Sequence, residues 1–183
     1  SKQTPQTTYG MTKAICELSI NDHTRKGHFD GRSVRLPTVI IRPGKPNAAA
    51  SSWASGMFRE PRNGETCELP IKRNQSHPMT GFMTVIDSFI ALHEVDEVDL
   101  DDDRAYGLPA LSITPILAEK VLEEVAKEKK LRIGKIEDAY DPRIQSIVDN
   151  WPTAADGSRA IALGLPKPPP LKHIIEQYLD YFS

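Results

Sequence analysis

The sequence predicts an α/β fold with a parallel sheet, and three segments support this prediction. Residues 6–26 form a helical stretch near the start of the chain. Residues 33–41 follow as a β-branched, apolar run of the kind that is buried on both faces of a parallel sheet. Residues 80–95 carry apolar side chains at helical spacing, which predicts a buried or strongly amphipathic helix. Helices and strands that alternate along a chain are typical of the α/β class.

The other elements are predicted from local signals. Ser51 is a residue type that caps helix N-termini, so residues 51–60 are expected to form a short helix. Thr114 followed by Pro115 is typical of an N-cap and a first helical position, which predicts a helix to about Lys130. Further strands are expected at residues 65–71, 104–113 and 133–136, and further helices at 141–151, 156–164 and 171–182.

The composition is that of an ordinary folded chain. The 183 residues are 39% hydrophobic and 26% charged, which fits one domain or one domain plus part of another. The net charge of −2 implies no strong attraction to nucleic acid or to a membrane. We find no apolar run of 18 residues, so no transmembrane helix is predicted, and no signal peptide precedes the first helix, although a truncated start would hide one. A cytoplasmic location is expected because a reduced cysteine fits a reducing cytosol better than secretion.

No metal site is expected from the sequence. The two cysteines, Cys16 and Cys67, lack the spacing of metal ligands, and Cys16 is expected to be a reduced core residue. The acidic residues between 94 and 104 are expected to form a solvated loop. They lack the glycine turn of a calcium loop.

The segment Tyr9-Gly-Met-Thr-Lys13 carries the main chemical signal. A spacing of four places a phenol and an ammonium on one face of a helix, about one turn apart. A free tyrosine has a pKa of about 10 and is a poor base at neutral pH. A neighbouring cation favours the phenolate, so the pair could take a proton from a hydroxyl while a hydride leaves the same carbon. The alternative is a solvated Tyr-Lys pair on a helix.

Three motifs in order resemble the extended short-chain dehydrogenase/reductase family, which belongs to the NAD-dependent epimerase/dehydratase superfamily. They are Y-G-M-T-K-A, then R-L-P-T-V-I-I-R-P-G, and then a tail with D-G-S-R-A and L-G-L-P. Within this family, the segment R-P-G-K-P-N-A-A-A-S is most similar to the D-erythronate dehydrogenase subfamily. The resemblance covers nearly the whole chain.

The resemblance implies the C-terminal part of a Rossmann-type parallel sheet domain plus a small α/β substrate-binding domain. Residues 1–50 would belong to the Rossmann-like domain. Residues 51–183 would be mainly substrate-binding, with about 72–95 returning to the Rossmann-like domain. The glycine-rich turn that cradles a dinucleotide pyrophosphate does not occur in the chain. We therefore expect the N-terminal nucleotide-binding half to be absent from it.

The resemblance also assigns the catalytic pair. Tyr9 would be the general base, assisted by Lys13, and both would contact the cofactor. Leu36, Pro37 and Thr38 would lie beside the nicotinamide ring. The cofactor would be NAD or NADP, with NAD favoured. Both stay open because the residues that choose between them belong to the missing half.

Substrate-binding residues are predicted on two further segments. Arg42 and Lys45 follow the expected strand 33–41, at the end where open α/β sheets bind ligands, and either cation could hold a carboxylate. A loop arginine that binds backbone carbonyls is the alternative for Arg42. His77 could reach a polar substrate, and a capping or solvated histidine is the alternative there.

These observations predict an NAD(P)-dependent oxidoreductase fragment that oxidises a hydroxyl of a sugar acid such as D-erythronate. The alternatives are a nucleotide-sugar epimerase or dehydratase of the same superfamily, and a non-catalytic fragment that lacks the cofactor half. The expected partners are a small sugar acid or sugar nucleotide, the N-terminal half of the same protein, and a second copy. In this family the helix at 6–26 pairs across a two-fold axis into a four-helix bundle, which predicts a homodimer.

Overall fold

The computed structural model describes residues 3–47 and 49–182. The helices are α1 (Thr8–Arg25), α2 (Ser52–Arg62), α3 (Phe82–Glu94), α4 (Pro115–Glu128), α5 (Pro142–Val148), α6 (Ser158–Ala162) and α7 (Leu171–Phe182). The strands are β1 (Ser33–Arg35), β2 (Thr38–Ile40), β3 (Cys67–Leu69), β4 (His77–Gly81), β5 (Ala105–Gly107), β6 (Leu111–Ile113) and β7 (Ile136–Asp138). The α/β class predicted from the sequence is confirmed.

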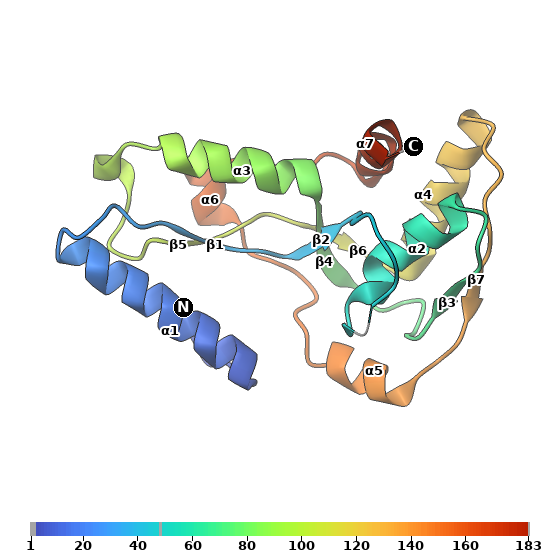
Figure 1. Cartoon of the computed structure of the whole chain (residues 1–183), viewed down its shortest axis with the longest axis horizontal. Coiled ribbons are helices and arrows are strands. Elements are labelled where there is room, and N and C mark those ends of the chain that lie inside the picture. Colours follow the sequence, from blue (N-terminus) through green and yellow to red (C-terminus); the bar gives the residue numbers. More distant parts are fainter. Residues whose placement is uncertain (1–2, 48, 183) are drawn as a thin grey trace.

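The strands form short ladders that are mostly parallel. β1 pairs with β5, β2 with β4 and β3 with β7, all in parallel, while β6 adds to β4 in the antiparallel direction. Figure 1 shows α1 on one side of the β1–β5 pair, with α3 and α6 on the other side. At the opposite end of the molecule, α4 lies between α2 and α7, and α2 also packs beside β3.

The expected strand at 33–41 is divided in two, and this corrects the prediction of one continuous strand. β1 pairs with β5, whereas β2 pairs with β4. The break falls at Leu36 and Pro37, and a proline has no N–H to donate to a ladder. Burial is complete only at the end of the run, at Ile40 and Ile41. The ladder thus changes partner at the segment for which the resemblance implies cofactor contact.

Several helix ends lie at the capping residues that the sequence predicts. Thr114 Oγ1 accepts a hydrogen bond from the amide of Leu117 at 3.2 Å, as an N-cap does. Asp141 Oδ1 caps α5 in the same way. Ser51 takes the N-cap position of α2 but makes no capping hydrogen bond with its side chain. Gly164 follows α6 with a φ of +83°, a conformation that favours glycine.

The buried apolar residues form two clusters. The larger one joins α2, α4 and α7 to the β2–β4–β6 sheet, and its largest fully buried side chains include Met57, Phe58, Leu69, Met79 and Ile174. The smaller one lies around β5, α3 and α6 and contains Val85, Leu92, Tyr106, Leu108, Ala160 and Leu165. Each end of the molecule therefore has an apolar core.

Helix α1 is attached differently, because none of its residues is buried. Polar contacts hold it, among them the hydrogen bond from the Gly31 amide to Thr24 Oγ1. Cys16 is exposed, so the expectation of a core cysteine is wrong. The large apolar side chains of Met11, Ile15 and Leu18 are also exposed on this helix. In the described part of the chain, no helix has the length and apolarity needed to span a membrane.

Candidate active site

Tyr9 and Lys13 lie on the first two turns of α1. Thr7 caps this helix by accepting a hydrogen bond from the amide of Gly10 at 3.0 Å. The Lys13 Nζ atom lies 5.4 Å from the centroid of the Tyr9 ring, within the range of a cation–π contact. The Tyr9 side chain is 72% exposed. The phenol is therefore accessible to a ligand and has a cation beside it.

A pocket of about 560 Å³ opens between this face of α1 and β1. Tyr9, Lys13 and Leu36 all line it, so the structure brings the predicted catalytic pair to the first of the predicted cofactor-binding residues. Glu17 and Arg35 line it as well. Sequence reasoning did not single out either of these two, although Glu17 follows Lys13 by one helical turn.

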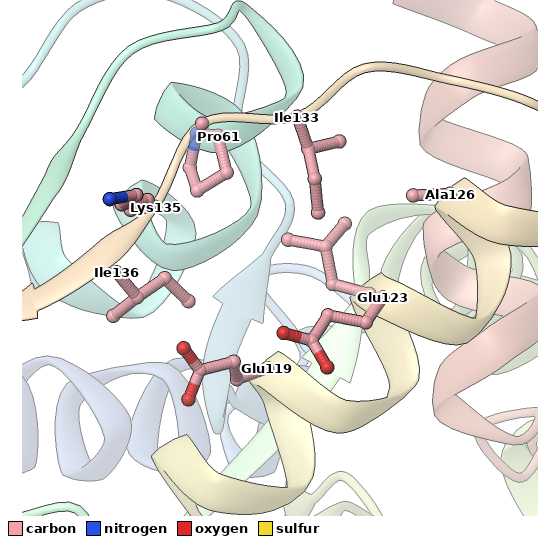
Figure 2. A pocket seen from close by; sticks show the side chains of 9 residues that line it. Pro61, Glu119, Glu123, Ala126, Ile133, Lys135 and Ile136 are labelled. Carbon is pink, nitrogen blue, oxygen red and sulfur yellow. The ribbon is translucent and has the colours of Figure 1, made fainter.

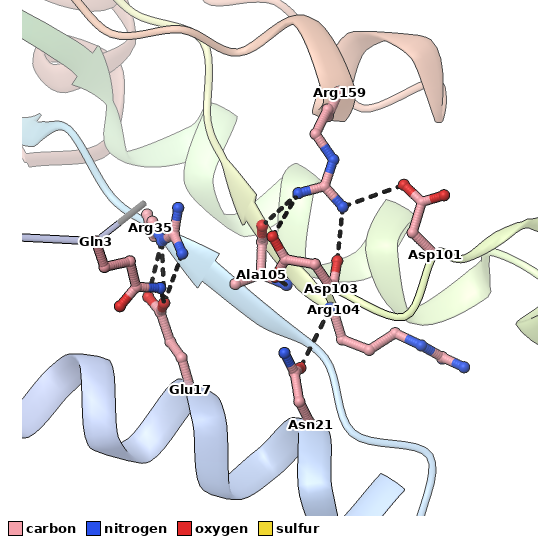
Figure 3. A network of polar contacts seen from close by, with 9 residues as sticks. All are labelled: Gln3, Glu17, Asn21, Arg35, Asp101, Asp103, Arg104, Ala105 and Arg159. Atoms are coloured by element: carbon pink, nitrogen blue, oxygen red, sulfur yellow. Dashed lines mark hydrogen bonds and ion pairs between the residues drawn. The ribbon is translucent and has the colours of Figure 1, made fainter. Parts of the chain in front are cut away.

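Glu17 and Arg35 form an ion pair between α1 and β1 (Figure 3). Arg35 Nε donates to Glu17 Oε1 at 2.9 Å, and Arg35 Nη2 donates to Oε2 at 2.7 Å. Gln3 Nε2 adds a third donor at 2.6 Å from Oε2. The hydrogen bond with Glu17 raises the pKa of Arg35 against the opposing effect of burial. Arg35 is therefore charged at any working pH.

The predicted residues Thr38 and His77 are hydrogen-bonded to each other. Thr38 Oγ1 lies 2.7 Å from Nε2 of His77, which begins β4. The imidazole is only 4% exposed and packs against the rings of Trp53 and Trp151, with centroids 5.9 and 5.0 Å away. Burial lowers the pKa of His77, although the backbone of Pro152 opposes the shift. The ring is thus a neutral, buried group and neither a helix cap nor a solvated side chain.

The predicted substrate-binding cations lie in the loop after β2. Arg42 and Lys45 are both exposed, and neither lines the pocket that contains Tyr9. The backbone of Arg42 is fixed to α2, because its amide donates to Ser55 Oγ at 3.1 Å and its carbonyl accepts from Arg59 Nη1 at 3.2 Å. The alternative of a loop arginine that binds carbonyls finds no support, since the Arg42 guanidinium makes no hydrogen bond within residues 3–47 and 49–182.

A second pocket of about 530 Å³ adjoins this loop. The loop residues Pro46 and Asn47 line it together with Trp53 and Glu60 of α2. Glu60 pairs with Arg59 in a buried ion pair. The second carboxylate oxygen of Glu60 and the indole N–H of Trp53 are buried without a hydrogen-bond partner among the described residues. Arg59 and Glu60 directly follow the apolar residues Met57 and Phe58 in α2, and this was the sequence signal that could have identified the position.

A third pocket, of about 480 Å³, contains none of the predicted site residues (Figure 2). Glu119 and Glu123 come from α4, whereas Lys135 directly precedes β7 and Ile136 is its first residue. Glu119 is engaged in an ion pair with Arg73. Across the residues that the structure describes, no cluster of three or more histidine, cysteine or acidic side chains could hold a metal ion.

Comparison with known proteins agrees with the motifs. A D-erythronate dehydrogenase of Haemophilus influenzae is 40% identical to the chain over 178 residues, which are 97% of the chain and 56% of that protein. A D-erythronate dehydrogenase of Cupriavidus necator is 35% identical over 96% of the chain and 54% of its own length. The crystal structure of a nucleoside-diphosphate-sugar epimerase from Agrobacterium tumefaciens matches with a TM-score of 0.89 and 34% identity, over 100% of the chain and 53% of that protein.

The chain spans about half the length of the curated relatives that it matches. No protein-family model matches it. Both the sequence similarity and the structural similarity nevertheless extend over nearly all of its residues. In sequence and in fold, the chain corresponds to the C-terminal part of an extended short-chain dehydrogenase/reductase, with D-erythronate dehydrogenases among its relatives.

Proposed function

We propose that the protein to which this chain belongs is an NAD(P)-dependent dehydrogenase that oxidises a hydroxyl of a sugar acid, with D-erythronate as the favoured substrate. The observation that carries this proposal is the pocket shared by Tyr9, Lys13 and Leu36. It combines an accessible phenol, a neighbouring ammonium and the strand break at which the family contacts its cofactor. The relatives named D-erythronate dehydrogenase support the choice of substrate.

The residues present fit the nicotinamide end of a dinucleotide. Leu36 is half-exposed beside the Tyr9 and Lys13 face, which leaves an apolar surface open to a flat ring. Lys13 would donate to the nicotinamide ribose, and Leu36, Pro37 and Thr38 would lie against the ring. When bound, NAD(P) supplies the acceptor for the hydride that leaves the carbinol carbon.

In this proposal Tyr9 removes the proton of the substrate hydroxyl as the C–H bond breaks, so the alcohol becomes a ketone. The Lys13 ammonium stabilises the phenolate that accepts the proton. Arg42 or Lys45 would bind the substrate carboxylate. Arg42 is favoured because a guanidinium can hold both carboxylate oxygens. His77 has almost no free surface, so we assign its contribution to the Thr38 hydroxyl, which it holds in place.

A nucleotide-sugar epimerase is the second candidate, since the nucleoside-diphosphate-sugar epimerase of solved structure is 34% identical to the chain. Both candidates use the same Tyr-Lys pair and differ in the substrate. The free carboxylate oxygen of Glu60 in the second pocket would accept a hydrogen bond from a hydroxyl of either substrate. The relatives named D-erythronate dehydrogenase favour the sugar acid.

The test is an assay of the intact protein, comprising this chain and the rest of its polypeptide. D-erythronate is offered with NAD and, separately, with NADP, and reduction of the nicotinamide is followed by absorbance. UDP-glucose and UDP-galactose serve as comparison substrates. Their interconversion is followed by chromatography, because an epimerase reoxidises its cofactor in each turnover and produces no net change in absorbance. We expect turnover with D-erythronate and faster reduction of NAD than of NADP. Turnover of the nucleotide sugars alone would overturn the dehydrogenase proposal, and no turnover of any substrate would favour a non-catalytic role.

A further inference from the structure

Glu17 is placed where it would compete with Tyr9 for Lys13. It follows Lys13 by four residues on α1, and side chains at this spacing are neighbours that form ion pairs on a helix surface. All three side chains line the same pocket. An ion pair with Glu17 would draw the Lys13 ammonium along the helix and away from the phenol. The proposed mechanism needs the Lys13 ammonium to stay close to the Tyr9 phenol.

Arg35 and Gln3 occupy the Glu17 carboxylate instead (Figure 3). Arg35 reaches both oxygens, with Nε at 2.9 Å from Oε1 and 3.1 Å from Oε2, and with Nη2 at 2.7 Å from Oε2. Gln3 Nε2 donates to Oε2 at 2.6 Å. A carboxylate has about four lone-pair positions, so these contacts use most of its capacity. The side chain of Glu17 is only 16% exposed, which leaves little room for a further partner.

Lys13 is correspondingly free of carboxylates. Within the described ranges 3–47 and 49–182 it makes no ion pair, and its Nζ atom lies over the Tyr9 ring. We propose that Arg35 is a positioning residue: by holding the Glu17 carboxylate, it keeps the Lys13 ammonium available to Tyr9 and to the cofactor. This inference rests on the proposed function of the Tyr9 and Lys13 pair.

The direction of the effect follows from the charges around the pocket. The charged and titratable side chains that line it are Tyr9, Lys13, Glu17 and Arg35, and Asp103 acts on Arg35 from outside it. Without the Arg35 cation, Glu17 becomes a poorly solvated carboxylate with one remaining donor, Gln3. Lys13 is the cation within reach on the same helix. Its capture by Glu17 would remove positive charge from the phenol, so the phenolate would form at a higher pH.

The experiment measures the pH dependence of kcat in the intact protein for Arg35→Met, Glu17→Gln and the double variant. Arg35→Met should move the rising limb to higher pH by about one unit, because an adjacent opposite charge shifts a titration by about one to three units. Glu17→Gln should leave the rising limb of the kcat profile at its wild-type pH, and the double variant should return the limb to that pH. Arg25→Met is the matched control, since Arg25 forms an ion pair with Asp22 at the far end of α1.

The double variant separates positioning from a structural role. If Arg35 only attached α1 to β1, removing Glu17 as well would rescue nothing, and a shift that persists in the double variant would overturn the proposal. An unshifted Arg35→Met profile would also overturn it. If Arg35→Met fails to fold, Arg35→Lys takes its place. Its rising limb should shift to higher pH by a smaller amount, and adding Glu17→Gln should again reverse the shift.

The proposed function is tested separately by Tyr9→Phe. If Tyr9→Phe keeps its turnover, the assignment of the base is wrong, and the present inference fails with it. If Tyr9→Phe loses turnover while Arg35→Met is unshifted, only the inference about Arg35 is wrong.

Discussion

The hydroxyl of Thr38 and the Nε2 atom of His77 lie 2.7 Å apart and join β2 to β4. The imidazole is enclosed by two tryptophan rings, and its burial keeps it neutral. A neutral, buried histidine fixes the Thr38 side chain, and through it the start of β2.

This relationship predicts a pH-dependent stability. The pKa of His77 is lowered below its ordinary value of 6.5, so the unfolded state takes up the proton first as the pH falls. The contribution of His77 to the free energy of unfolding is therefore fully present above pH 6.5 and decreases below it. His77→Gln, which cannot titrate, should lose less stability than wild type between about pH 7.5 and 5.5 in urea unfolding. Exposed His93→Gln is the control, and equal losses for wild type and His77→Gln would contradict the prediction.

The buried ion pair of Arg59 and Glu60 predicts a large loss of stability. Arg59 also holds the carbonyl of Arg42, so the pair supports the loop that carries the proposed substrate-binding cations. Glu60→Gln would leave the Arg59 charge buried with weaker compensation, at a cost of about 3 kcal/mol in the free energy of unfolding. Glu68→Gln changes an exposed acid on β3 and should cost little. A loss below about 1 kcal/mol for Glu60→Gln would show that the pair is not structurally important.

Lys13 is expected to act on both the proton and the cofactor. Lys13→Met keeps most of the stem and removes the charge, so activity should appear at a higher pH and the dinucleotide should bind more weakly in calorimetric titration of the intact protein. Lys26→Met at the C-cap of α1 is the control, because Lys26 pairs with Asp22 at the far end of the helix. A Lys13→Met variant with the pH profile and cofactor affinity of wild type would argue against the role.

The exposed apolar side chains of α1 predict self-association. Met11, Ile15 and Leu18 lie at helical spacing on one side of a helix that buries none of its residues. We expect the intact protein to sediment as a dimer at micromolar concentration and Leu18→Glu to sediment as a monomer. Ile116→Glu, at an exposed position on α4, should leave the dimer intact. Sedimentation of wild type as a monomer only would remove this prediction.

Much of the fold could be predicted because its signals are local. Thr114 with Pro115, and Asp141 with Pro142, begin helices through their own side chains and ring geometry, and both predictions are confirmed. The Tyr9 and Lys13 spacing predicted a shared helix face, and the structure places both side chains in one pocket.

The errors concern tertiary partners. Nothing within residues 33–41 shows that β1 will pair with β5 and β2 with β4, so the run read as one strand. His77 reads as a polar residue before a helix, whereas β4 pairing and two distant tryptophans bury it. The contact between Glu17 and Arg35 carries no signal in the sequence, since it depends on how α1 lies against β1.

The turnover of Tyr9→Phe in the intact protein tests the central claim most directly. The substitution removes one hydroxyl from an exposed side chain, so the fold should persist, as circular dichroism can verify. With D-erythronate and NAD, kcat should fall by about 10²-fold or more. Tyr140→Phe, also exposed, is the matched control and should keep wild-type turnover. A Tyr9→Phe enzyme with near wild-type kcat would contradict the assignment of Tyr9 as the base.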